Sequence, residues 1–80
     1  MPHELLVEYL NCEESCRGKC DTYTCLHECT RDCVIKIVGR LGVSLEEAER
    51  LISAYNACVL KCMKGGRRGY GLCSRICLGT

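Results

Sequence analysis

Apolar residues and cysteines recur every three or four positions along most of the chain, which is the spacing of one face of an α-helix. The pattern predicts four helices, over about residues 3–19, 22–38, 44–64 and 69–78. The residues predicted to face inward are, helix by helix, Leu5, Leu6, Tyr9, Leu10, Cys12 and Cys16; Cys25, Leu26, Cys29, Cys33, Ile37 and Val38; Leu45, Ala48, Leu51, Ile52, Tyr55, Cys58, Val59 and Cys62; and Leu72, Cys73, Ile76 and Cys77.

Local signals mark several helix boundaries. Ser44 followed by Glu47 forms a capping box at the start of the third helix. The β-branched run 34–38 could form a strand, but the cysteine period continues into it and no partner strand is evident. We therefore expect a helix there, and we expect Gly39 and Gly42 to end it.

Short connectors between these helices imply antiparallel neighbours. We expect one all-α domain over residues 1–80, built from a first helical hairpin at about 3–38 and a second at about 44–78. Residues 39–43 would link the two hairpins. The predicted fold is two antiparallel hairpins, stapled by disulfides and packed as a small four-helix domain.

The ten cysteines are arranged with mirror symmetry about the turn of each predicted hairpin. Steps of four place thiols on one face of a helix, although they drift by about 40° per step. The drift leaves open whether one rung of the longer ladder pairs elsewhere. The symmetric pairing joins Cys20 to Cys25, Cys16 to Cys29 and Cys12 to Cys33 in the first hairpin, and Cys62 to Cys73 and Cys58 to Cys77 in the second.

A chain of 80 residues with ten cysteines and no Phe or Trp needs cross-links to supplement its core, and disulfides would make it highly stable. The start of the sequence shows no secretion signal, and no apolar run is long enough to span a membrane. The chain has no Gln, two Asn, seven Arg and four Lys. We therefore expect an intracellular protein of a hyperthermophile, where disulfides persist, rather than a secreted one.

The chain has a net charge of +1, but its acidic and basic residues are distributed unevenly along the sequence. Residues 1–57 carry six basic and ten acidic side chains, whereas residues 58–80 carry five basic and no acidic ones. Such polarity suggests an anionic partner, with nucleic acid as one possibility, or self-association as a homodimer. The candidate partner-binding residues are Lys61, Lys64, Arg67, Arg68, Tyr70 and Arg75.

The spacing C-x3-C, about ten residues, then C-x3-C at Cys58, Cys62, Cys73 and Cys77 resembles the α-hairpinin family of disulfide-stapled helical hairpins. The resemblance implies an inner and an outer disulfide. It also implies a role in defence, including trypsin inhibition through an arginine of the loop, which would be Arg67 or Arg68.

A different hypothesis keeps the thiols reduced. Repeated C-x3-C inside a helical bundle is similar to cytosolic copper storage proteins, whose cysteines bind Cu(I). The thiolates of Cys58, Cys62, Cys73 and Cys77 could also form a tetrahedral zinc site. Disulfides remain our main interpretation, with no metal or other cofactor.

No sequence motif indicates catalysis. His27 lies two residues from both Cys25 and Cys29, so on a helix its ring points away from both and a Cys–His pair is not expected. The chain lacks a nucleophile elbow, a P-loop and a dinucleotide fingerprint. We therefore expect a protein that is not an enzyme.

Overall fold

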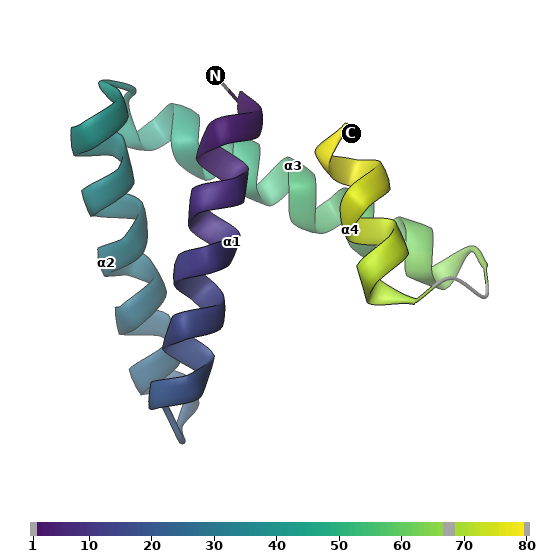
Figure 1. Cartoon of the computed structure of the whole chain (residues 1–80), viewed down its shortest axis with the longest axis horizontal. Helices are drawn as coiled ribbons and strands as arrows, with labels where there is room; N and C mark the ends of the chain where they lie inside the picture. Colours follow the sequence, from purple (N-terminus) through teal and green to yellow (C-terminus); the bar gives the residue numbers. More distant parts are fainter. Residues whose placement is uncertain (1, 67–68, 80) are drawn as a thin grey trace.

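The computed structural model describes residues 2–66 and 69–79, and these residues form four helices and no strand (Figure 1). The helices are α1 (Pro2–Lys19), α2 (Tyr23–Leu41), α3 (Leu45–Lys64) and α4 (Tyr70–Leu78). The all-α expectation is confirmed, and the β-branched run 34–38 is helical. Val34, Ile37 and Val38 pack into the apolar core from this helix, and this packing outweighs the strand preference of β-branched residues.

Two helical hairpins lie at an angle to each other (Figure 1). Helices α1 and α2 run antiparallel, and α3 crosses the end of this first hairpin where the chain begins. Helix α4 packs against the C-terminal half of α3, away from most of α1. The molecule is flat, with extents of 35 × 31 × 17 Å.

The core lies where α3 crosses the first hairpin and receives α4. It is made of small and medium apolar side chains with two tyrosines and a cysteine, consistent with a chain that lacks Phe and Trp. Its buried members are Leu5, Leu6, Tyr9, Ile37, Ala48, Ile52, Tyr55, Val59 and Cys73.

Polar side chains cap the starts of α2 and α3, where the sequence predicts helices to begin. The Ser44 hydroxyl accepts a hydrogen bond from the backbone N–H of Glu47 at 3.0 Å, as in a capping box. Thr22 caps α2 in the same way, accepting from the N–H of Cys25 at 3.2 Å.

The expected end of α2 at Gly39 is wrong, because the helix continues through Gly39 to Leu41. Of the two glycines, Gly42 has a left-handed backbone with φ of 72°, and its N–H bonds to the carbonyl of Val38. Gly39 has no positive φ and remains helical. A glycine ends a helix when it takes the left-handed conformation, and one that remains helical only lowers the propensity.

Five residues predicted to face inward are exposed instead: Cys25, Leu45, Cys58, Leu72 and Ile76. Helix α4 packs mainly on α3, through its cysteine face, so no further helix covers its neighbouring apolar flank. A disulfide between only two helices likewise keeps one side open to solvent. The helical period therefore predicted more inward-facing residues than the helices bury against one another.

Candidate functional site: disulfide ladders and a basic hairpin

All ten cysteines are joined in five disulfides, and each hairpin is stapled along its own length. The pairs are those that the mirror symmetry of the sequence predicts. Cys12–Cys33 and Cys16–Cys29 join α1 to α2, and Cys20–Cys25 joins the residue after α1 to the first turn of α2. Cys58–Cys77 and Cys62–Cys73 join α3 to α4.

All three predicted disulfides of the first hairpin are formed. Their Cα–Cα distances are 6.0 Å for Cys12–Cys33, 5.8 Å for Cys16–Cys29 and 5.5 Å for the pair at the turn. These values lie within the usual range for disulfides. The rotation of about 40° per step therefore does not prevent a third rung.

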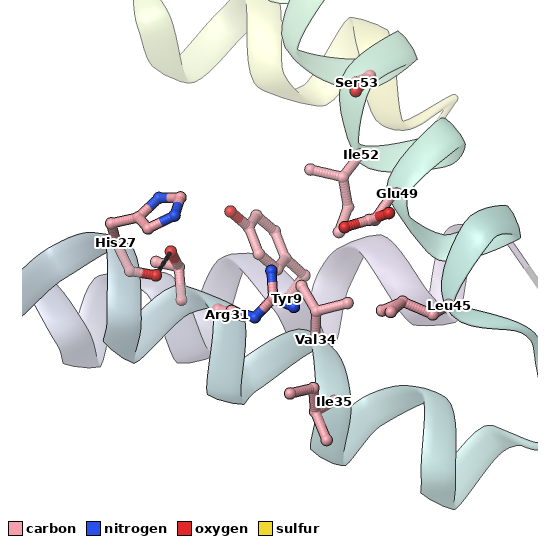
Figure 2. A pocket seen from close by; sticks show the side chains of 10 residues that line it. Tyr9, His27, Arg31, Val34, Ile35, Leu45, Glu49, Ile52 and Ser53 are labelled. Carbon is pink, nitrogen blue, oxygen red and sulfur yellow. Dashed lines mark hydrogen bonds between the residues drawn. The ribbon is translucent and has the colours of Figure 1, made fainter.

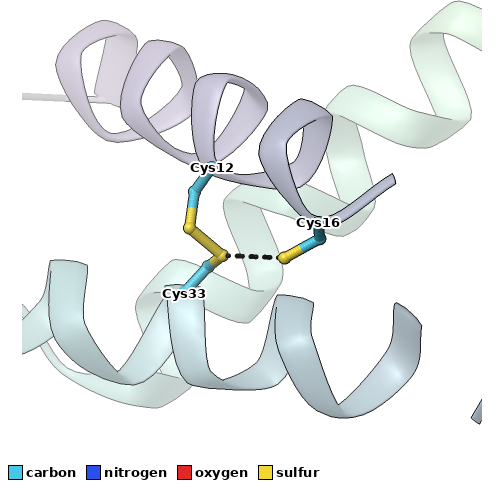
Figure 3. A group of neighbouring side chains, drawn as sticks. All are labelled: Cys12, Cys16 and Cys33. Atoms are coloured by element: carbon cyan, nitrogen blue, oxygen red, sulfur yellow. Dashed lines mark hydrogen bonds between the residues drawn. A yellow bond between two sulfur atoms is a disulfide. The ribbon is translucent and has the colours of Figure 1, made fainter. Parts of the chain in front are cut away.

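Neighbouring rungs of this ladder touch each other. The Sγ atoms of Cys16 and Cys33 belong to different disulfides and lie 3.6 Å apart in the protein interior (Figure 3). Neither sulfur carries a hydrogen, so the contact is one of van der Waals packing. The sulfur atoms thus pack between α1 and α2 toward the turn of the hairpin, whereas the buried core residues of these helices, Leu5, Leu6, Tyr9 and Ile37, lie toward its other end.

The sulfur atoms of Cys12, Cys16 and Cys33 all lie within 4.8 Å of one another. In the oxidised protein none of them is a thiolate, which is the form that binds metal ions. Sequence reasoning instead placed the alternative metal site at the four cysteines of the second hairpin. Those sulfurs are held in two disulfides as well.

The basic side chains of the second hairpin lie on its surface. Lys61 and Lys64 are exposed in the last turns of α3, three residues apart and hence on one side of the helix. Arg75 is exposed on α4. The candidates Arg67 and Arg68 lie outside the described residues.

Tyr70 begins α4 and lies beside α1, next to Glu13 and Arg17. A hydrogen bond to Tyr55, together with burial, raises its pKa to about 12. Its ring remains half exposed. The structure thus directs this candidate partner-binding residue toward the space between the hairpins, on the same side of α4 as Ser74.

A groove of about 360 Å³ lies on another side of the molecule, between α2 and α3 (Figure 2). Tyr9 forms part of its floor, and burial followed by the charge of Glu13 raises the pKa of Tyr9. His27 lies at the rim, with its ring stacked on Tyr23 at a centroid distance of 6.2 Å. Both cysteines near His27 are in disulfides, so the groove presents no Cys–His nucleophile.

Comparisons of the chain with models of protein families, with curated protein sequences and with solved structures find no match. The similarity to α-hairpinins thus rests on the cysteine spacing and on the stapled helices themselves. Within residues 2–66 and 69–79, none of the helices has both the length and the apolar composition needed to cross a lipid bilayer.

Proposed function

We propose that this protein is a non-enzymatic, highly stable binding module whose basic second hairpin contacts an anionic macromolecule, with nucleic acid as the first candidate. The observation that carries the proposal is the exposure of Lys61, Lys64 and Arg75 on the second hairpin, in the part of the sequence from residue 58 onward that has no acidic side chain. Exposed cations of this kind attract phosphate groups without a requirement for base sequence.

The disulfides support this role by fixing the cations relative to one another. Cys58–Cys77 and Cys62–Cys73 hold α4 against α3 on either side of Lys61 in the sequence. Charges on a rigid frame lose less conformational entropy when they bind than charges on a flexible segment. The carboxylates of the first hairpin would orient the module, because they repel the same partner.

Fluorescence anisotropy with labelled single-stranded and duplex DNA tests the proposal. Binding should weaken steeply between about 50 and about 200 mM salt, because phosphate contacts release counterions. The double variant Lys61→Ala/Lys64→Ala should lower the slope of log K against log salt by about 2. The matched control is Lys19→Ala/Lys36→Ala, which removes two exposed lysines from the first hairpin. Equal effects of both variants, or no binding at low salt, would contradict the proposal.

A second candidate function is binding of Cu(I) or zinc by reduced protein. It is favoured by the closeness of the three sulfur atoms of Cys12, Cys16 and Cys33. Soft thiolates prefer such ions. Metal analysis of protein reduced without denaturation would support this function only if metal bound and if a Cys12→Ser/Cys16→Ser variant lost it.

The five disulfides indicate an environment in which thiols oxidise. Together with the scarcity of amide side chains, they lead us to propose a hyperthermophilic source and an intracellular location. Thermal unfolding with and without reductant tests the stability part of this proposal. Oxidised protein should unfold above about 90 °C, the range of hyperstable domains.

A further inference from the structure

The folded chain exposes more surface than a monomer of its size usually does. Its accessible surface is 5724 Å², whereas a compact monomer of this mass has about 4800 Å². Its radius of gyration is 12.9 Å, against about 11.6 Å for a compact domain of this length. The excess area is close to the ~800 Å² that each partner loses in a standard protein interface.

Part of this surface forms a groove between the two hairpins, which we call the inter-hairpin groove. Two adjoining cavities of about 330 and 320 Å³ form it, and both are bordered by Glu13, Arg17 and Tyr70. Helix α3 contributes Leu60 and Met63 to its wall. Both are large apolar side chains on the surface, because Leu60 is 69% exposed and Met63 is 41% exposed.

We propose that the inter-hairpin groove is the interface of a two-fold symmetric dimer, in which a second copy of this chain covers Leu60, Met63 and Tyr70. Burial of these apolar side chains supplies the driving force. The dimer is independent of the proposed binding of an anionic partner, and it brings two basic hairpins into one particle.

The charges in the groove favour a second copy over nucleic acid as the occupant. Glu13 and Glu14 lie there beside Arg17, and Glu13 pairs with Arg17 at 3.7 Å. Carboxylates in these positions repel a phosphate backbone. A two-fold axis brings each patch against its own copy, so a patch with both signs of charge can complement itself.

Other exposed apolar residues of the second hairpin lie outside the groove. Tyr70 and Ser74 are one turn apart and line it together. Leu72 and Ile76 are also one turn apart, and each follows Tyr70 or Ser74 by two residues. They therefore lie about 200° around the α4 axis from Tyr70 and Ser74. Ile76 is 47% exposed, similar to Met63. This flank of α4 supplies a matched control of equal apolar character.

Sedimentation velocity of the oxidised protein, from micromolar to near-millimolar concentration at physiological salt, tests the proposal. The wild type should approach twice the monomer mass of 8.9 kDa. Leu60→Glu should raise the dimer dissociation constant by at least about tenfold, because it places a charge at the centre of the interface. Met63→Glu should act in the same direction, whereas Ile76→Glu should change the constant by less than about threefold.

Far-UV circular dichroism and the absence of titratable thiols would establish that each variant keeps its helices and disulfides. A wild type that remains monomeric at the highest concentration would overturn the proposal. The same conclusion would follow if Ile76→Glu dissociated the dimer as strongly as Leu60→Glu, because the interface would then lie on the other flank of α4.

Discussion

The side-chain oxygens of Tyr55 on α3 and Ser74 on α4 lie 2.5 Å apart, so a hydrogen bond joins the two helices next to Cys73. Tyr55 also raises the pKa of Tyr70. The second hairpin is therefore held by the hydrogen bond between Tyr55 and Ser74 in addition to its two disulfides.

Replacing Tyr55 by Phe should remove the hydrogen bond to Ser74. We expect the free energy of unfolding to fall by about 1 kcal/mol, the usual net contribution of a hydrogen bond. The pKa of Tyr70 should move down toward the ordinary value of 10.0, because its largest cause of elevation is removed. Ultraviolet titration of the phenols measures the second effect. Tyr23→Phe is the control, since Tyr23 is highly exposed and lies on α2.

Alkaline pH should destabilise the protein through the same tyrosines. The pKa values of Tyr9 and Tyr70 are raised in the folded state, so these phenols keep their protons above pH 10 while the unfolded chain loses them. Their contribution to stability is therefore complete below pH 10 and declines between pH 10 and about 12.

Guanidinium unfolding midpoints should accordingly be constant between pH about 8 and 9.5 and fall from pH about 10 upward. In Tyr55→Phe the fall should be shallower, because Tyr70 then titrates nearer to its unfolded value. A midpoint that stays constant to pH about 11.5 would show that the folded phenols titrate as in the unfolded chain.

The helices and the cysteine ladders could be predicted from the sequence because both depend on local spacing. Sequential steps of four fix which residues share a helix face, and short turns bring the faces together. The predicted end of α2, at residue 38, lies three residues before the observed end at Leu41. The sequence does not tell which of Gly39 and Gly42 takes a positive φ.

The placement of the candidate site depends on how the two hairpins meet, which spacing alone does not determine. The pattern assigned Leu72 and Ile76 to the core because it counted apolar residues without knowing that α4 packs mainly on one helix. It assigned Tyr70 to the candidate partner-binding residues, whereas Tyr70 lines the inter-hairpin groove beside residues of α1 and α3. Both differences follow from the angle between the hairpins.

The rungs of the first ladder should contribute unequally to stability. Cys20–Cys25 closes a short loop at the turn, and its entropic contribution is about 2 kcal/mol. Cys12–Cys33 adds about 2.5 kcal/mol beyond the neighbouring rung, because Cys16–Cys29 already closes most of its loop. Cys33 is also buried, so losing its sulfur removes packing worth about 1 kcal/mol more.

We therefore expect Cys12→Ala/Cys33→Ala to lower the free energy of unfolding more than Cys20→Ala/Cys25→Ala does. Denaturant unfolding followed by circular dichroism measures both, with thiol titration to establish that the other four disulfides remain. An equal or larger loss for the pair at the turn would mean that the buried sulfur contact of Cys33 with Cys16 adds nothing to stability.

The two glycines at the end of α2 should respond to alanine in opposite directions. Gly39 is exposed and helical, and an added Cβ there meets no neighbour within 4 Å. Gly39→Ala should raise the free energy of unfolding by about 0.5–1 kcal/mol, through better helix propensity. Gly42 has φ of 72°, where a Cβ is unfavourable, so Gly42→Ala should lower it by about 1 kcal/mol. Denaturant unfolding of the two variants compares them directly, and a loss of stability in Gly39→Ala would mean that α2 ends before residue 39.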